Sequence, residues 1–401
     1  MIYNQKNNNE INNFSINEFR AYPDVSSEGP AKVLLVGMGA DIGSNILFLS
    51  TTRGIKYPVT DVLTHSIISE GVGAANRSSL DELKARLILA NPSLYDKVKT
   101  NEETSSIIIN GHNFRIHFRD FDSGLESLGK FDLAILATSR RHIRSRAHLE
   151  KLQSLAKVVI GVAENSELPA LYPALLSADA GHFSAAKSAI GSELTGSFSM
   201  GSCQCVGYTT GIRVLADYCS DNDVLLQDVL LHSEVDIIHP DTASSNFGTN
   251  RMGSRTEDPR DNLRPGVSQV AESMHRFKPA TGVNTVSLRV LTQPPGYQIQ
   301  RFFLKNMNVD IDKLIQVARR IESEEPSLIH VTQDPIGSKA YASMPCGLVL
   351  IATEQHISAK TIGDITEVTL QAYVHNTLGY SAAILATTDR VLNGESLTFI
   401  N

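Results

Sequence analysis

The chain alternates short apolar runs with polar turns that contain glycine, and the first such unit begins at Lys32. Residues 32–36 form a continuous apolar run of strand length, and an apolar stretch with helical spacing follows at 46–49. The turn between them contains Gly37, Gly39, Ile42 and Gly43. Strand, glycine turn and helix in this order are typical of a dinucleotide-binding unit, in which the glycines bring a helix N-terminus close to a pyrophosphate.

The glycine spacing is GxGxxxG, one residue longer than the usual form, so a glycine-rich turn of any α/β protein explains it equally well. The next strand is expected at 59–63 and is followed by Thr64 and His65, where an NAD-binding fold usually offers a carboxylate to the ribose. The missing carboxylate leaves room for a 2′-phosphate, which Ser66 and nearby basic residues could bind. The pattern therefore leaves NAD and NADP both open as the cofactor.

Strands continue to alternate with helices up to about residue 200. Asn110 and Gly111 are a strong hairpin-turn pair between expected strands at 105–110 and 113–118. Buried strands are expected at 131–137 and 157–162, and a basic helix is expected between them. This alternation predicts a mostly parallel sheet.

The pattern changes in the second half, where strands occur with few helices between them. A long polar loop occupies 240–265. Strands are expected at 229–238, 285–292, 297–305, 347–352 and 368–375, and helices at 310–321 and 380–392. We therefore expect a second domain, beginning near residue 203, with a mixed or antiparallel sheet.

Composition narrows the classes of function. The 401 residues are 42% hydrophobic, enough for a packed core, and the net charge of -7 argues against a nucleic-acid partner held by a basic surface. We find no apolar run of about 18 residues, so no membrane span is expected. Residues 1–29 form a polar N-terminal extension without the apolar core of a signal peptide. Four cysteines are too few and too clustered for a secreted disulfide framework, so a cytoplasmic protein is expected.

Cys203 lies where the pattern predicts that a strand ends and a helix begins, in the segment SMGSC at 199–203. The start of a helix lowers the pKa of a thiol, and its free backbone N–H groups can bind an oxyanion. A histidine within reach would complete an activated thiolate, and His232 follows in a predicted strand 29 residues later. On the pattern alone the pair is unspecific, because the chain has 12 histidines and a buried cysteine is most often a packing residue.

From about residue 32 to residue 395 the chain resembles the glyceraldehyde-3-phosphate dehydrogenase family, with the motifs in the family's order. The glycine turn stands where the family has its NAD turn, and FDLAILATS at 131–139 resembles the strand that ends in Ser-Thr-Gly. SMGSC resembles the family's Ser-Asn-Ala-Ser-Cys, and VLLHS at 229–233 resembles the strand that carries the catalytic histidine. LRVLT at 288–292 and YVHNTLGYS at 373–381 are similar to its Arg-Val-Pro-Thr and Tyr-Asp-Asn-Glu-Trp-Gly-Tyr-Ser.

The resemblance implies a fold class of α/β plus α+β. An N-terminal Rossmann dinucleotide-binding domain would span 30–202 and be completed by the C-terminal helix 380–401, and the catalytic domain would span 203–379. The catalytic residues would be Cys203, as nucleophile, and His232. The cofactor-binding residues would be Gly37, Gly39, Ile42, Gly43, Thr138 and Asn376, the last of which would hold the nicotinamide amide. The substrate-binding residues would be Ser202, Thr281 and Arg289, the last at the position of a phosphate-binding arginine.

The chain departs from the family mainly where the substrate would bind. Gln204 and Cys205 replace the two threonines that usually follow the nucleophile, and a phosphate-binding hydroxyl after the catalytic histidine is also replaced. Thr281 belongs either to the family's Thr-Gly pair or merely to a turn. Cys205 is a rival nucleophile, because counting from it to His232 gives the family's spacing without a gap. The pattern of buried positions in the following helix favours Cys203.

These features predict an NAD(P)-dependent aldehyde dehydrogenase that acts on a small-molecule aldehyde through a cysteine thiohemiacetal and thioester. One alternative is a semialdehyde or acyl-phosphate reductase of the aspartate-semialdehyde type, with arginines at 251–264 binding a carboxylate. Another is a non-catalytic binding or regulatory relative. No metal is expected, because no cysteine–histidine cluster has the spacing of ligands. The resemblance also implies a homotetramer.

Overall fold

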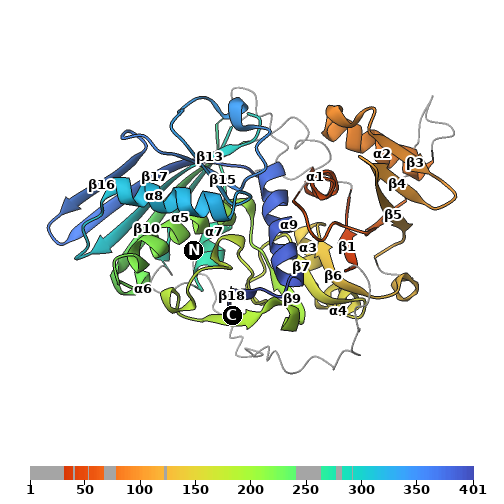
Figure 1. The fold of residues 1–401 in the computed structure, drawn as a ribbon, viewed down its shortest axis with the longest axis horizontal. Coiled ribbons are helices and arrows are strands. Elements are labelled where there is room, and N and C mark those ends of the chain that lie inside the picture. Colours follow the sequence, from red (N-terminus) through yellow and green to blue (C-terminus); the bar gives the residue numbers. More distant parts are fainter. Residues whose placement is uncertain are drawn as a thin grey trace, which may run out of the picture.

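The computed structural model describes residues 31–38, 41–52, 54–66, 78–121, 124–240, 263–276, 282–290 and 292–401. In this part of the chain, two eight-stranded sheets lie side by side, with helix α9 (Leu378–Leu392) between them (Figure 1). The predicted extension at 1–29 and residues 241–262 of the predicted polar loop lie outside the described residues.

The first sheet consists of β1 (Val33–Val36), β2 (Asp61–Thr64), β3 (Val98–Asn101), β4 (Ser106–Ile109), β5 (His112–Phe118), β6 (Phe131–Leu136), β7 (Ala156–Gly161) and β9 (Gly196–Ser199). Their order in space is β3-β4-β5-β2-β1-β6-β7-β9. The strands from β5 to β9 run parallel, and β3 and β4 run antiparallel at one edge. Parallel strands covered on both faces are apolar throughout, which explains why every residue of β1 is buried. The prediction of a mostly parallel first sheet is confirmed.

The helices of this half are α1 (Asp41–Ser50), α2 (Ser79–Ala90), α3 (Arg140–Ile143) and α4 (Arg146–Gln153). The single basic helix expected after β6 is two short helices, because Ser145 caps the second one by accepting a hydrogen bond from the backbone N–H of His148. The expected hairpin turn joins β4 and β5, and Asn110 and Gly111 both have positive φ, at 49° and 85°.

The second sheet consists of β10 (Leu230–Pro240), β11 (Arg264–Pro265), β12 (Asn284–Val290), β13 (Gly296–Lys305), β14 (Ile329–Thr332), β15 (Leu348–Ile351), β16 (Ile357–Ile362) and β17 (Ile365–Val374). The order is β11-β12-β10-β13-β17-β15-β14, and β16 also pairs with β17. The pairs β10–β12 and β14–β15 are parallel and the others are antiparallel, so the sheet is mixed. The helices of this half are α5 (Cys203–Ser220), α6 (Leu226–Val229), α7 (Val270–Met274) and α8 (Ile311–Glu324).

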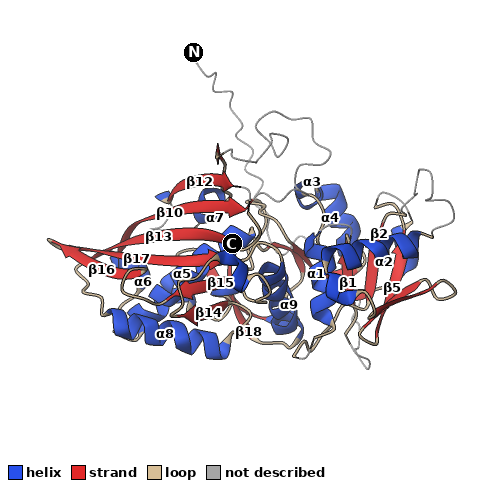
Figure 2. Cartoon of the chain, turned by 90° about the horizontal axis from the view of Figure 1, so that it is seen from above, coloured by secondary structure: helices blue, strands red, loops and turns tan. Residues whose placement is uncertain are grey.

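Helix α5 packs along one face of this second sheet, which we call the inner face (Figure 2). On β13 the buried side chains of Gln298, Gln300 and Phe302 belong to this face. Residues 297, 299, 301 and 303 alternate with them and are only half-buried. Which face a strand residue belongs to therefore decides whether it can approach α5.

The end of the chain returns to the first half. Helix α9 packs against α1, and Ser381 of α9 donates a hydrogen bond to the backbone carbonyl of Ile42 (3.2 Å). The last strand, β18 (Ser396–Ile400), pairs antiparallel with β8 (Ala186–Ile190) of the first half. Among the helices of the described ranges, none has both the length and the hydropathy needed to cross a membrane.

Candidate functional site

Cys203 is the first residue of α5, an 18-residue helix that starts directly after β9. Ser202 is the N-cap: its Oγ accepts a hydrogen bond from the backbone N–H of Cys205 (3.3 Å). The preceding turn needs Gly201, which has φ of +72° and whose added Cβ would lie 2.9 Å from Tyr172. This local structure places a half-buried thiol at the positive end of a long helix, where free N–H groups can stabilise an anion.

Cys205, the rival nucleophile, is the third residue of the helix and is fully buried. Its sulfur lies 2.9 Å from the Ser273 hydroxyl and accepts a hydrogen bond from Ser202 (3.4 Å). Burial, with a smaller effect from the nearby Glu164 carboxylate, raises the pKa of the Cys205 thiol to about 11. An inaccessible, protonated thiol is a poor nucleophile, so the structure favours Cys203 over Cys205.

His232 does not lie near Cys203, and the predicted cysteine–histidine pair is wrong. The α5 N-terminus lies by the Gln298 end of β13, because Gln298 donates to the backbone carbonyl of Gln204 (2.9 Å). His232 pairs with Phe303, at the other end of β13, and stacks on its ring on the face opposite α5. Its remaining contacts are with Asn284 and Glu234, on that same outer face.

The histidine at the correct end of the strand is His239, which sequence analysis did not select. Strand alternation puts it on the inner face with the buried Val235 and Ile237. The strand end lies next to α5: a Cβ on Gly296 would be 2.6 Å from the Ile238 carbonyl and 3.7 Å from the Gln204 side chain. The sequence does contain a signal for His239: it lies two residues after Ile237 and four after Val235, so strand alternation places it on the same face as these apolar residues.

Arg289, the predicted substrate ligand, lies on the same face beside His239, its partner in the parallel pairing of β10 and β12. Gly266 lies close to the same face: an added Cβ would be 2.8 Å from the Ser287 hydroxyl, which is too close, and 3.4 Å from the Arg289 Nε. Ser287, two residues earlier, has a buried hydroxyl without a hydrogen-bond partner among the described residues. The structure thus places Ser202, Arg289 and Cys203 at one end of the second sheet, whereas Thr281 lies outside the described residues.

The predicted cofactor residues of the first half form a close-packed turn. Gly37 has φ of +94°, and an added Cβ would lie 2.6 Å from the Thr138 methyl group; one on Gly43 would lie 2.2 Å from the Gly37 carbonyl. Only glycine fits these two positions, and they keep the start of α1 close to the ends of β1 and β6. The carbonyl of Ile42 bonds to α9, and Gly39 lies outside the described residues.

Asn376 lies between β17 and α9. Its side-chain Oδ1 is shielded from solvent and accepts no hydrogen bond from the described residues. Four residues later, the Tyr380 hydroxyl donates to the backbone carbonyl of Gly201 (2.7 Å), and this places the start of α9 beside the turn that precedes Cys203. A buried acceptor without a donor fits a ligand that carries an amide N–H, as a nicotinamide carboxamide does.

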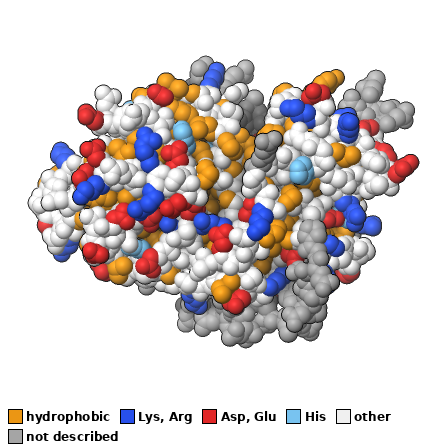
Figure 3. All heavy atoms as spheres, viewed as in Figure 1, with side chains coloured by type: hydrophobic (Ala, Val, Ile, Leu, Met, Phe, Trp, Pro, Cys, Tyr) orange, Lys and Arg blue, Asp and Glu red, His pale blue; other side chains and the backbone are white. Residues whose placement is uncertain are grey.

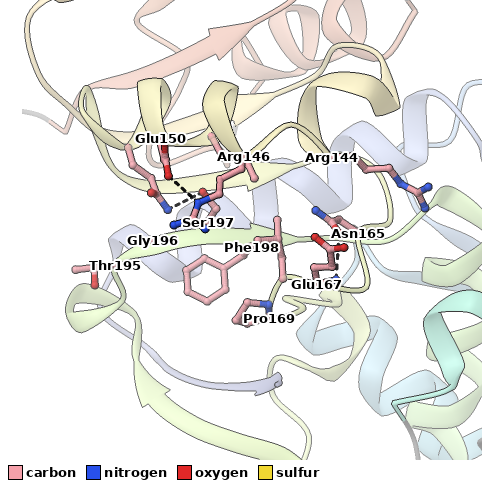
Figure 4. A pocket seen from close by; sticks show the side chains of 13 residues that line it. Arg144, Arg146, Glu150, Asn165, Glu167, Pro169, Thr195, Gly196, Ser197 and Phe198 are labelled. Carbon is pink, nitrogen blue, oxygen red and sulfur yellow. Dashed lines mark hydrogen bonds and ion pairs between the residues drawn. The ribbon is translucent and has the colours of Figure 1, made fainter. Parts of the chain in front are cut away.

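A separate pocket of about 70 Å³ lies between α4 and β9 (Figure 4), and Cys203 is not among the residues that line it. Four of its polar side chains are paired with each other: Arg146 pairs with Glu150 (2.8 Å), and Gln153 donates to Ser197 (2.8 Å). On the molecular face of Figure 3, acidic and basic side chains are interspersed. The best candidate for a reactive site is therefore the end of the second sheet beside the start of α5, rather than this pocket or the charged surface.

A search of protein-family models finds none that matches this chain, and a search of curated proteins finds no match either. Neither search identifies a family for this chain, and the resemblance stays a prediction from the sequence motifs.

Proposed function

We propose that the chain is an NAD(P)-dependent aldehyde oxidoreductase with Cys203 as its nucleophile. The observation that supports this best is the accessible thiol at the start of α5, beside the strand ends that carry His239 and Arg289. An activated cysteine, a histidine and an arginine at one helix N-terminus are the groups that thiol-dependent carbonyl chemistry uses.

In this proposal, the Cys203 thiolate attacks the aldehyde carbon, and the new carbon–sulfur bond gives a thiohemiacetal oxyanion. The backbone N–H groups of the first turn of α5 stabilise that oxygen, and His239 exchanges the proton with it. Loss of hydride leaves a thioester on Cys203, which water or phosphate cleaves to release the acid or acyl phosphate and restore the thiol. The reverse direction reduces an activated acid to the aldehyde with the same groups.

The first sheet is proposed to be a Rossmann domain that binds NAD or NADP. The glycine turn around Gly37 and Gly43 would accept the pyrophosphate, because these two glycines hold the start of α1, with its backbone N–H groups, close to the ends of β1 and β6. Asn376 would orient the nicotinamide through its Oδ1, which accepts no hydrogen bond within the part of the chain that the structure describes. When bound, the nicotinamide accepts or supplies the hydride. Residues at the end of β2, Thr64 and His65, bring no carboxylate to the ribose, so NADP remains as good a candidate as NAD.

The substrate would be an aldehyde with an anionic group for Arg289, carboxylate or phosphate, and a polar group that reaches Ser287. The buried Gln204, in place of a family threonine, offers no hydroxyl beside the nucleophile. Homotetramer formation and a cytoplasmic location stay predictions from the sequence.

The proposal is tested by screening phosphorylated and carboxylated aldehydes with NAD and NADP, using the wild-type chain, Cys203→Ala and Cys205→Ala. Turnover should be lost by a factor of about 10³ or more in Cys203→Ala and largely kept in Cys205→Ala. Nucleotide affinity, measured by calorimetry, should be unchanged in both variants. Full activity of Cys203→Ala, or no binding of either nucleotide to the wild-type chain, would refute the assignment.

A further inference from the structure

Three buried glutamines form a hydrogen-bonded layer between α5 and the inner face of the second sheet. Gln204 is the second residue of α5, and Gln298 and Gln300 lie on β13; each is at most 1% exposed. The Gln300 Nε2 donates to the Gln298 Oε1 (2.7 Å), and the Gln298 Nε2 donates to the Gln204 Oε1 (2.7 Å). We call these three side chains the glutamine layer.

Two backbone carbonyls of α5 fix the direction of these hydrogen bonds. The Gln298 Nε2 also donates to the carbonyl of Gln204 (2.9 Å), and the Gln300 Nε2 donates to the carbonyl of Gly207 (3.0 Å). A carbonyl oxygen only accepts hydrogen bonds, so a flipped amide would face it with a second oxygen. The orientation of the Gln298 side chain is therefore determined, and both of its N–H groups bond to one residue, Gln204.

The surface of α5 is glycine where the glutamine layer packs. An added Cβ on Gly211 would lie 1.9 Å from the Gln300 Oε1, and one on Gly207 would lie 3.2 Å from the Gln298 Oε1. The two glycines are four residues apart, so they lie on the same side of the helix. A larger residue at 211 would displace the Gln300 carboxamide, so the helix surface is shaped to hold the layer.

Packing alone does not explain the glutamine layer. The Gln204 Nε2 and the Gln300 Oε1, at its two ends, are shielded from solvent and have no hydrogen-bond partner within the described ranges. A buried polar group without a partner costs about 1–3 kcal/mol. Leucine or methionine side chains would fill the same space without this cost, which indicates a role other than core stability.

Gln298 lies between the two parts of the candidate site. On the α5 side it holds the backbone carbonyl of Gln204, the residue directly after Cys203. On the sheet side it is paired with Ile237 of β10, and His239 is two residues further along the same inner face. Diagonal neighbours of this kind lie about 7–8 Å apart, within reach of long side chains. One amide thus joins the first turn of α5 to the strand end that carries His239.

We propose that Gln298 is a positioning residue that sets the placement of Cys203 relative to His239, with Gln300 and the two glycines holding it in orientation. The inference rests on the proposed function, in which these two residues act together. A misplacement of about 1 Å can cost a factor of about 10² in rate. Because a neighbouring histidine activates a cysteine by favouring its thiolate, the alkylation rate of Cys203 reports the placement without turnover.

The test is a double-mutant cycle of Gln298→Met and His239→Asn. Its readout is the rate at which iodoacetamide alkylates Cys203 at pH 7, with the modified residue located by peptide fragmentation in a mass spectrometer. Each single variant should slow this rate by about fivefold or more. In the His239→Asn background, Gln298→Met should slow it by less than about twofold, because the histidine that it places is already absent.

Two further variants separate positioning from loss of structure. Gln371→Met changes a half-buried glutamine on the outer face of the same sheet, which accepts a hydrogen bond from the Tyr297 hydroxyl (2.8 Å), and should keep the wild-type rate. Gln298→Met combined with Gln300→Met leaves no unpaired Gln300 amide and should melt no lower than Gln298→Met alone, yet be alkylated as slowly.

A wild-type rate in Gln298→Met, or single effects that multiply in the double variant, overturns the inference and leaves the proposed function intact. Multiplied effects are the result expected of a residue that only supports the fold. A wild-type rate in His239→Asn overturns the proposed action of His239 on Cys203, and this inference with it.

Discussion

Exchange of each histidine on β10 for asparagine distinguishes the two candidate bases. His232 and His239 are seven residues apart on one strand, which at about 3.3 Å per residue places their backbones about 23 Å apart. An odd separation also puts them on opposite faces of the sheet. A general base must approach within about 3.2 Å of the proton that it takes, or act through one water, so His232 cannot serve Cys203.

General acid–base catalysis contributes a factor of about 10²–10⁴, equivalent to about 3–5 kcal/mol of transition-state stabilisation. We expect His239→Asn to lose this factor in kcat/KM for the best aldehyde of the substrate screen. His232→Asn should stay within about twofold of wild type. Its cost should instead be about 1 kcal/mol of stability, because the ring stacks on Phe303 and contacts Asn284.

The assay follows the absorbance of reduced nicotinamide at saturating cofactor, and thermal unfolding of both variants provides the control for folding. A loss of about 100-fold or more in His232→Asn, with His239→Asn near wild type, would refute the placement of the site at the α5 end of β10. If both variants instead keep the activity of the wild type, neither histidine takes part in the reaction.

Two further changes follow from the packing of the site. Gly37→Ala should weaken nucleotide binding and destabilise the fold by about 1–3 kcal/mol from the positive φ alone, and the clash with Thr138 should add to this loss. Gly54 has a similar φ of +99° but open space around it, so Gly54→Ala should show the cost of the φ without a clash. The difference in melting temperature between the two variants therefore measures the contribution of the clash. Burial raises the Cys205 pKa to about 11, so its thiol stabilises the fold fully below the unfolded pKa of about 8.5, and this contribution falls as pH rises toward 11. Between these two pH values, the melting temperature of the wild type should therefore fall more steeply than that of Cys205→Ala. If the melting temperatures of the two proteins change with pH in parallel, the pKa of Cys205 is not raised.

The elements that sequence predicts well are those with a strong local pattern. The continuous apolar run at β1, the Asn110–Gly111 turn and the helical spacing in α8 each define an element without reference to the rest of the chain. Strands β8 and β18 are not predicted, and the residues of β18 fall in the helix that the resemblance implies at 380–401, which ends at Leu392. These two short strands form by pairing with each other although they lie far apart in the sequence.

In the candidate site, too, some residues are predicted by a local pattern and others are determined only by tertiary packing. Cys203 and its cap could be recognised from SMGSC, because a strand followed by a helix start is a local feature. The choice between His232 and His239 depends on where β10 ends and on which face packs on α5, and the strand extends two residues beyond its predicted end. Glu164 and Ser273, which meet beside Cys205, carry no local pattern at all, since their contacts form only after α7 packs against α5.

The return of α9 and β18 to the first half affects how the protein can be made. Since α9 covers α1 and β18 pairs with β8, the first half cannot finish packing until residues 378–400 have left the ribosome. The glycine turn is therefore assembled late in synthesis although it is encoded early. A message truncated before residue 378 would yield a polypeptide with the Gly37 turn but without the helix that supports it, which makes it a substrate for proteolysis rather than a free nucleotide-binding fragment.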